Sequence, residues 1–343
     1  MNGVKSTNKK VNINKIKRTI LLLSILIIAL AIGIISLIVV QDHKKLDMPH
    51  AYDIQQELFG THGAEIKMQK SDSFASLLCV TDENVAHNAI APPARIKSVL
   101  MDLDDHEVVF AQNIHEKSYP ASVTKLMTAL VAVKYGTLTD IITITDSALH
   151  LEEGSTEMGL QAGDQTTLDE LLHALLIYSG NDAAMAIAEH IGGTVEEFVA
   201  MMNQEAHALG ATNTNFVNPS GLHDENHYTT VYDIYLMLNE AIKSSYLSEI
   251  MMLNVYNFSY TRGEQVLIKR LDSTDQYLTK QVTPPKGVTV LGGKTGTTSD
   301  AGSCLALVSQ NAYGEPYISI VLNAPTKVSL YTNMNQLLEQ INS

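Results

Sequence analysis

The chain opens with an uninterrupted apolar stretch between two polar flanks. Residues 19–40 hold 22 positions without one charged side chain, and leucine and isoleucine predominate. A helix of this length, at 1.5 Å per residue, spans a bilayer core of roughly 30 Å. Six basic residues and no acidic residue precede it, while Asp42 follows shortly after. The pattern predicts a cytoplasmic tail at 1–18, a transmembrane helix at 19–40 and an extracytoplasmic remainder.

A cleaved signal peptide is the alternative to a retained anchor. The apolar core of a signal peptide usually holds about 7 to 15 residues and ends at a small-x-small cleavage pattern. The run at 19–40 is longer, and no such pattern follows it. We therefore expect a single-pass protein of the cell membrane. Residues 41–90 are polar and weakly periodic, which predicts a linker before a domain at 91–343.

The first organised segment of that domain has the pattern of a β-hairpin. Two largely apolar runs, 98–103 and 108–110, flank the turn Asp104–His106. Acidic residues at a hairpin turn are usually turn formers, so we do not expect a cation site there.

Two later segments carry helical periodicity. Apolar residues three and four positions apart follow Ser122 and continue to Gly136. A second apolar stripe follows Thr167 and ends at Tyr178, and Glu170 stands where a capping box requires it. Both segments are predicted to be helices.

The last third of the chain returns to strands. Apolar runs at 288–291 and 305–308 predict two strands, a further strand follows, and a final helix is expected at 326–341. Together with the first hairpin they form an antiparallel sheet flanked by helices. We therefore predict an α+β fold rather than a doubly wound one.

The charge and the cysteine content limit which partners and cross-links can be expected. Six of the 23 basic residues lie in the tail, so 17 remain against 37 acidic residues, a formal charge of about −20 on the exported part. Nucleic acid is not expected to bind such a surface. Only Cys79 and Cys304 are present, so the fold cannot depend on a disulfide framework, and the sequence leaves their pairing open.

Ser122 and Lys125 form an S-x-x-K motif at the start of the first predicted helix. Alone the motif is weak, because residues 6–9 match it by chance and an N-cap serine beside a solvated lysine is the ordinary explanation. At a helix start, however, the helix dipole favours a developing oxyanion on Ser122. Lys125 lies one turn later and can reach the serine hydroxyl. The pair predicts a serine nucleophile with a lysine as its base.

A lysine acts as a base only when it is neutral for part of the time. Its reference pKa of about 10.4 must therefore be lowered by burial or by a neighbouring cation. Lys294, in the third motif, is predicted to be that cation.

The second motif is Ser179-Gly180-Asn181, at the corner between two predicted helices. A plain turn is the ordinary explanation of these three residues. A corner held between buried helices can instead project both polar side chains into a cleft with little freedom. We expect Ser179 to pass the proton to the leaving amine and Asn181 to hold the substrate amide.

The third motif, Lys294-Thr295-Gly296, is expected on or beside a strand. Lys294 and the Thr295 hydroxyl can bind a terminal carboxylate, and Gly296 lets a substrate backbone approach closely. The N–H of Thr297 can complete an oxyanion hole with that of Ser122. Three such motifs in this order are a strong signal for a serine acyl-enzyme that needs neither a metal nor another cofactor.

With these residues the exported part resembles the serine-type D-alanyl-D-alanine carboxypeptidases, the low-molecular-mass penicillin-binding proteins. The resemblance runs from about Ile96 to the C-terminus. Besides the three motifs, four segments resemble sequences typical of that family: Tyr119-Pro120-Ala121, Met127-Thr128-Ala129-Leu130, Asn181-Asp182-Ala183-Ala184 and Asn218-Pro219-Ser220-Gly221-Leu222.

The resemblance implies a β-lactamase/transpeptidase-like fold, with an all-helical subdomain beside the sheet. It implies Ser122 as acyl-ester nucleophile, Lys125 as proton acceptor and Ser179 as third catalytic residue, with Lys294 contacting the substrate. The implied reaction removes the terminal D-alanine from peptidoglycan stem peptides, and β-lactams would act as covalent inhibitors. The segment 261–286 lacks the Asn-rich approach that often precedes the third motif, so contacts made there by relatives are not carried over.

Three alternatives remain. A β-lactamase would need a second base, and the nearest candidate pair, Glu249 with Asn254, has the wrong spacing. A penicillin-sensing domain would be acylated without turnover. A metal enzyme would use His223 and His227, but their segment resembles a loop, so solvated histidines are expected.

Overall fold

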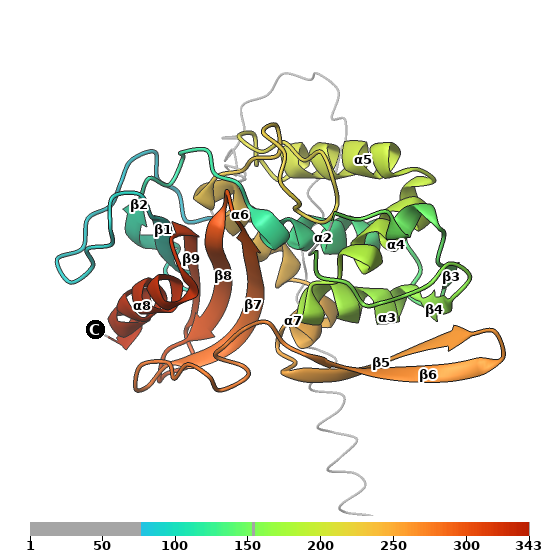
Figure 1. The fold of residues 1–343 in the computed structure, drawn as a ribbon. Helices are drawn as coiled ribbons and strands as arrows, with labels where there is room; N and C mark the ends of the chain where they lie inside the picture. The colour runs from blue at the N-terminus through green and yellow to red at the C-terminus, as the bar shows by residue number, and fades with distance from the viewer. Residues whose placement is uncertain (1–76, 153–154, 343) are drawn as a thin grey trace, which may run out of the picture. The chain divides into compact units, whose positions relative to one another are not determined.

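A five-stranded antiparallel sheet with the order β2-β1-β9-β8-β7 forms the centre of the structure (Figure 1). The structure is a computed structural model that describes residues 77–152 and 155–342, all within one compact unit, Ser71–Ser343. The predicted hairpin pairs with the last strand, and the predicted antiparallel sheet is confirmed. The strands are β1 (Lys97–Asp102), β2 (Glu107–Gln112), β7 (Thr289–Thr298), β8 (Gly302–Gln310) and β9 (Pro316–Ala324).

The turn between β1 and β2 is built by an acidic side chain, as expected. The Asp102 carboxylate accepts hydrogen bonds from the backbone N–H groups of Asp104 at 2.9 Å and Asp105 at 3.1 Å. The carboxylate is therefore occupied by the turn itself.

Each face of the sheet is covered by helices because apolar residues point alternately to both sides. In β8, Leu305 and Leu307 belong to the core under α8 (Lys327–Leu338), whereas Ala306 and Val308 belong to the core on the other face. α8 buries residues at helical spacing on the sheet: Leu330, Tyr331, Met334, Leu337 and Leu338. A 3₁₀ turn, Glu339–Asn342, ends the chain, so the predicted C-terminal helix is confirmed.

The opposite face packs against a helical region. α6 lies against β1 and β9, and α2 packs in turn against α4, α5 and α6. The helices are α2 (Lys125–Tyr135), α3 (Leu168–His173), α4 (Asn181–Gly192), α5 (Val195–Ala208), α6 (Val231–Ala241) and α7 (Ser245–Met251), with a 3₁₀ turn before α2 (Ala121–Thr124) and a π-helix after α3 (Ala174–Tyr178).

The prediction of an all-helical subdomain is wrong in one respect. A second antiparallel sheet, with the order β3-β4-β5-β6, lies beside α3 (Figure 1). Its strands β5 and β6 form a long two-stranded arm, and β6 lies in the segment 261–286, which lacks the family's Asn-rich approach. These strands are β3 (Ile141–Thr143), β4 (Gln165–Thr167), β5 (Val255–Arg262) and β6 (Gln265–Asp272).

The capping box at α3 is only half formed. The Thr167 hydroxyl accepts from the N–H of Glu170 at 3.2 Å, as predicted. The Glu170 carboxylate does not return to Thr167 but accepts from the N–H and the hydroxyl of Ser259, at 2.9 and 2.6 Å. A strand of the second sheet therefore takes the place of the local partner.

The packed part of the chain starts before the boundary predicted at residue 91. Cys79 is fully buried and its N–H donates to the Tyr235 hydroxyl at 2.9 Å, and Val85 pairs with Ala111. Cys79 and Cys304 are both buried and not bonded to each other.

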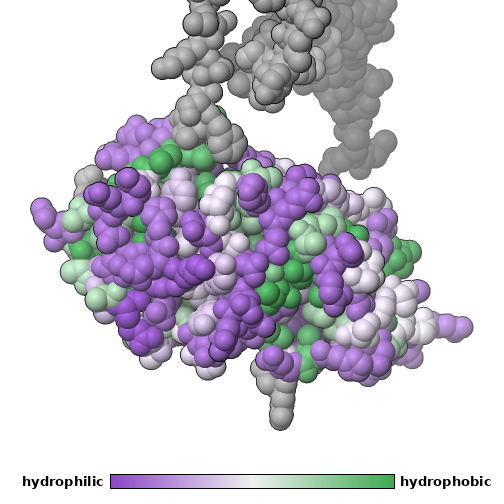
Figure 2. Space-filling model, turned by 90° about the horizontal axis from the view of Figure 1, so that it is seen from above, coloured by the Kyte–Doolittle hydropathy of each residue, from purple (hydrophilic) through white to green (hydrophobic). Residues whose placement is uncertain are grey.

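The tail, the predicted transmembrane helix and most of the linker lie outside the described residues. Within residues 77–152 and 155–342, none of the helices combines the length and apolarity needed to cross a bilayer. The face of the molecule seen from above is mainly hydrophilic, with apolar residues gathered in small patches (Figure 2).

Candidate active site

The fold brings the three predicted motifs together at one end of the edge strand β7. Ser122 lies in the 3₁₀ turn before α2, Ser179 lies at the corner before α4, and Lys294 lies within β7. They surround a cleft of about 140 Å³. Its lining includes Ser122, Ser179, Thr295, Gly296 and Thr297 from the predicted site, together with Thr156, Thr274 and Tyr331.

Lys125 connects the first two motifs. Its Nζ donates to the Oγ of Ser122 at 2.9 Å and to the Oδ1 of Asn181 at 2.7 Å. A third bond, also of 2.7 Å, goes to the backbone carbonyl of Ser220. In its protonated form Lys125 thus uses all three of its N–H donors, and the side chain is fully buried.

The backbone before Ser122 is held in an unusual conformation. Ala121 has a φ of +48°, in the left-handed region that non-glycine residues seldom adopt. Gly221 packs directly on it with a φ of +85°, and a Cβ at Gly221 would lie 1.9 Å from the Ala121 carbonyl oxygen. The Asn218 side chain holds this loop by accepting from the N–H groups of Ser220 and Gly221. A second loop therefore sets the position of the serine.

The pKa of Lys125 is well below its ordinary value. Burial is the main cause, because a buried ammonium loses its hydration, and the positive charge of Lys294 lowers the pKa further. The carboxylate of Asp182 acts in the opposite direction. The predicted effect of Lys294 on Lys125 is therefore confirmed in direction, although burial lowers the pKa more than the neighbouring charge does.

Ser179 ends the π-helix in a left-handed conformation, with a φ of +70°. Its Oγ accepts from the Nζ of Lys294 at 3.0 Å. The corner is fixed by Asp182, whose carboxylate accepts from the N–H groups of Met158 and Gly159 at 2.8 and 3.1 Å. The corner predicted from the sequence is thus a rigid element that projects Ser179 into the cleft.

Lys294 is the second fully buried lysine of the site. Its Nζ donates to Ser179 and to the carbonyl oxygen of Thr295, each at 3.0 Å. Burial lowers its pKa to about 7, and the carboxylate of Asp275 opposes this shift. Asp275 is itself buried, which raises its pKa to about 6.

The fold requires glycine at position 296 for a second reason, besides the predicted approach of a substrate backbone. A Cβ at this position would lie 2.8 Å from the backbone nitrogen of Ser122 and 3.0 Å from the Pro120 carbonyl oxygen. The absence of a side chain therefore lets β7 approach the turn that carries Ser122. Thr295 is anchored by a 2.5 Å hydrogen bond between its hydroxyl and that of Thr274.

Sequence reasoning missed several residues that support the site. Ser220 lies in a segment that resembles the family, but the sequence does not indicate that its backbone carbonyl oxygen accepts a hydrogen bond from Lys125. Asp275 and Thr274 lie in the segment 261–286, which does not resemble the family's sequence. A single acidic residue there does not indicate a place in the site. Only the tertiary structure places that segment beside β7.

The expectation of solvated histidines is wrong for His227. The residue lies in a loop, as predicted, but is buried. Its Nδ1 accepts from the N–H of Val217 at 3.2 Å, which makes Nε2 the donor to the Thr124 hydroxyl at 2.8 Å. Burial lowers its pKa to about 4. Within the described residues, no group of three or more metal-ligating side chains gathers.

Comparison with known proteins agrees with this geometry. Residues 85–326 match the model of the peptidase S11 family, D-alanyl-D-alanine carboxypeptidase. The chain is 32% identical to D-alanyl-D-alanine carboxypeptidase DacA of Haemophilus influenzae over 77% of its length, and 33% identical to DacF of Bacillus subtilis over 71%. It spans 66% and 60% of these relatives' own lengths.

The fold also has close counterparts among solved structures. The crystal structure of the Streptomyces K15 DD-transpeptidase superposes with a TM-score of 0.66 at 24% identity, covering 73% of this chain and 98% of the other. At this identity the likeness concerns the fold alone, which is the penicillin-binding protein and transpeptidase fold that was predicted. The chain belongs to the peptidase S11 family of D-alanyl-D-alanine carboxypeptidases.

Proposed function

We propose that this protein is a serine-type D-alanyl-D-alanine carboxypeptidase that removes the terminal D-alanine from peptidoglycan stem peptides. The observation that carries the proposal is the buried Lys125, whose Nζ lies 2.9 Å from the Oγ of Ser122 and whose pKa is strongly lowered. A lysine in this state can accept the serine proton, whereas a solvated lysine cannot.

Acylation then follows from the positions of these groups. The Oγ of Ser122 attacks the carbonyl carbon of the penultimate D-alanine while its proton moves to the Nζ of Lys125. The N–H groups of Ser122 and Thr297 stabilise the oxyanion. The C–N bond breaks, Ser179 delivers a proton to the leaving amine and is reprotonated by the proton that Lys125 took from Ser122, and free D-alanine departs. Water hydrolyses the Ser122 ester and regenerates the serine.

The third motif recognises the end of the substrate. The Thr295 hydroxyl lines the cleft and can bind the terminal carboxylate, while the fully buried Lys294 supplies positive charge behind it through its hydrogen bond to Ser179. The free edge of β7, beyond Gly296, offers its backbone to an extended peptide, as in strand addition. Asn181, which holds Lys125 in the free enzyme, is placed to contact the substrate amide as well.

A β-lactam would enter by the same route. Attack by Ser122 on the lactam carbonyl opens the ring, and the released amine stays attached to the acyl group. Covalent binding of β-lactams is therefore part of the proposal. No metal or other cofactor is required for these steps.

The proposal also includes attachment to the cell membrane. Its basis is the apolar stretch at 19–40 with its basic flank, which is typical of a single membrane-spanning anchor. The catalytic domain would then face the extracytoplasmic side, where peptidoglycan lies.

The β-lactamase alternative has less support. Its candidate base, Glu249, is an exposed residue of α7 and does not line the cleft. A sensor domain that stays acylated shares the geometry of Ser122 and Lys125, so kinetics must separate the two.

The decisive experiment incubates the full-length chain with a peptide ending in D-Ala-D-Ala and measures free D-alanine. Ser122→Ala is the matched control, and mass spectrometry follows the penicillin adduct in parallel. Release that vanishes in the variant supports the carboxypeptidase. A stable adduct without release would replace it with the sensor, and rapid turnover of penicillin would replace it with the β-lactamase.

A further inference from the structure

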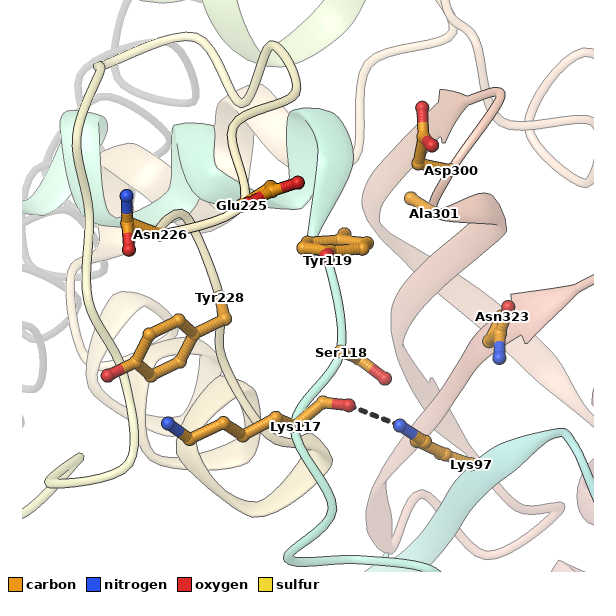
Figure 3. A pocket seen from close by; sticks show the side chains of 10 residues that line it. All are labelled: Lys97, Lys117, Ser118, Tyr119, Glu225, Asn226, Tyr228, Asp300, Ala301 and Asn323. Atoms are coloured by element: carbon orange, nitrogen blue, oxygen red, sulfur yellow. Dashed lines mark hydrogen bonds between the residues drawn. The ribbon is translucent and has the colours of Figure 1, made fainter.

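A second hollow of about 460 Å³ lies beyond the turn that joins β7 to β8. Figure 3 shows its lining: Lys97, Lys117, Ser118, Tyr119, Glu225, Asn226, Tyr228, Asp300, Ala301 and Asn323. None of the catalytic side chains belongs to it. It is nevertheless adjacent to the site, because Tyr119 precedes Ser122 by three positions and Asp300 follows the end of β7 by two.

One side of this pocket carries two cations, the largely buried Lys97 and the exposed Lys117. The ammonium of Lys97 donates to the carbonyl oxygen of Lys117, and its nearest carboxylate, that of the exposed Glu116, is 3.7 Å away. Burial lowers the pKa of Lys97. Lys117 rests its ammonium 3.8 Å from the centre of the Tyr228 ring, and among the described residues it forms no ion pair. An anion in the pocket could pair with both ammonium groups.

Ser118 adds a polar group without a partner. The residue is 8% exposed, and its Oγ has no hydrogen-bond partner among the described residues. Its backbone is fixed by two hydrogen bonds with Thr229, of 2.8 and 2.9 Å. In Figure 3 the hydroxyl points to the side of the pocket that holds Lys97 and Asn323. A buried hydroxyl without a partner is costly, so a ligand that accepts from it is favoured.

The remaining lining suits a peptide. Glu225 and Asp300 place carboxylates at the other side of the pocket, where they can accept from amide N–H groups. The rings of Tyr119 and Tyr228 supply apolar surface between the two sides. Asp300 lies four residues beyond Gly296, in the turn that follows the end of β7 at Thr298. A peptide lying along β7 past Gly296 therefore runs toward this pocket.

We propose that this pocket binds a carboxylate of the stem peptide that lies upstream of the terminal D-Ala-D-Ala, with Lys97 and Ser118 as its donors. The inference rests on the proposed function, because it assigns a further part of the same substrate. It goes beyond that function by stating which chemical group the enzyme prefers at a position remote from the bond that breaks.

The test compares three peptides on the full-length chain. The first is a short acetylated peptide ending in D-Ala-D-Ala, the second a pentapeptide with one upstream carboxylate, and the third the same pentapeptide with that carboxylate amidated. We expect kcat/KM for the acidic pentapeptide to exceed that for the amidated one by roughly tenfold, as one charge-assisted hydrogen bond provides. Lys97→Met and Ser118→Ala should each reduce this ratio toward one.

The controls separate this inference from the proposed function. Lys243→Met removes an exposed cation on another face and should keep the wild-type ratio. A wild-type kcat/KM that is nearly the same for the acidic and the amidated pentapeptide overturns the proposed subsite. So does an equal loss of kcat/KM on all three peptides in Lys97→Met. Absence of turnover of the short peptide refutes the proposed function instead. In that case calorimetry of the acidic and amidated pentapeptides with Ser122→Ala still decides the subsite, because equal affinities exclude it.

Discussion

Lys294 donates to Ser179 and at the same time lowers the pKa of Lys125, which donates to Ser122. Both lysines are fully buried, and each donates a hydrogen bond to a different serine. Because two like charges are costly in one buried site, the proton on one lysine disfavours a proton on the other. In the proposed mechanism, this arrangement would let Lys125 act as a base while Lys294 remains a cation.

Replacement of Lys294 should change the acidity of Lys125. In Lys294→Met the neighbouring positive charge is lost, so the pKa of Lys125 should rise. The acidic limb of the kcat/KM profile should move to higher pH, in addition to a loss of rate from weaker carboxylate binding. A profile measured on D-alanine release tests this, and an unmoved acidic limb would show that the two lysines are not coupled.

Asp275 should keep Lys294 protonated. Its carboxylate raises the pKa of Lys294, so Asp275→Asn should shift the alkaline limb of kcat/KM to lower pH. The raised pKa of Asp275, about 6, means that its charged form is disfavoured in the folded protein. Stability is therefore lost as pH rises from about 4 to about 6.

The same variant should consequently be more stable at pH 8, by about 2 kcal/mol, and show no gain at pH 4. Chemical denaturation at the two pH values measures the difference. Asp272→Asn, which removes an exposed carboxylate of the same segment, is the matched control and should show neither effect. A gain that is equal at both pH values would contradict the role of charge.

His227 should make the fold sensitive to acid. Its pKa is about 4 in the folded protein, against about 6.5 for an unfolded histidine, so the unfolded state binds more protons between these values. The free energy of unfolding should therefore fall by up to about 3 kcal/mol as pH decreases from 6.5 to 4. In His227→Gln this slope should flatten, whereas His207→Gln, on an exposed position of α5, should retain it.

Gly221 should be intolerant of a side chain. Alanine there would place Cβ 1.9 Å from the Ala121 carbonyl oxygen, so the turn that carries Ser122 must shift. We expect a loss of stability of about 2 kcal/mol or more and a larger loss of kcat than of substrate affinity. Gly314→Ala is the control, because its φ of +89° is equally unfavourable for alanine while no atom lies within 4 Å. Equal effects of both substitutions on kcat would exclude the contact as the cause.

Local patterns in the sequence were sufficient for the elements that carry the three motifs, but not for the second sheet. The helix that starts near Ser122, the corner at Ser179 and the strand at Lys294 follow from periodicity and turn chemistry, which act between near neighbours in the chain. The order of the three motifs then identified the class of chemistry.

Contacts between distant segments were decided by the tertiary structure. The carbonyl of Ser220 reaches Lys125 across 95 positions, and Lys294 reaches Ser179 across 115. Asp275 and the arm of β5 and β6 depend on which segments pack together, and no local pattern records that choice. Burial has the same origin. Burial lowers the pKa of both lysines and of His227 because a charged group loses its hydration in the protein interior. The sequence alone does not show which side chains become buried.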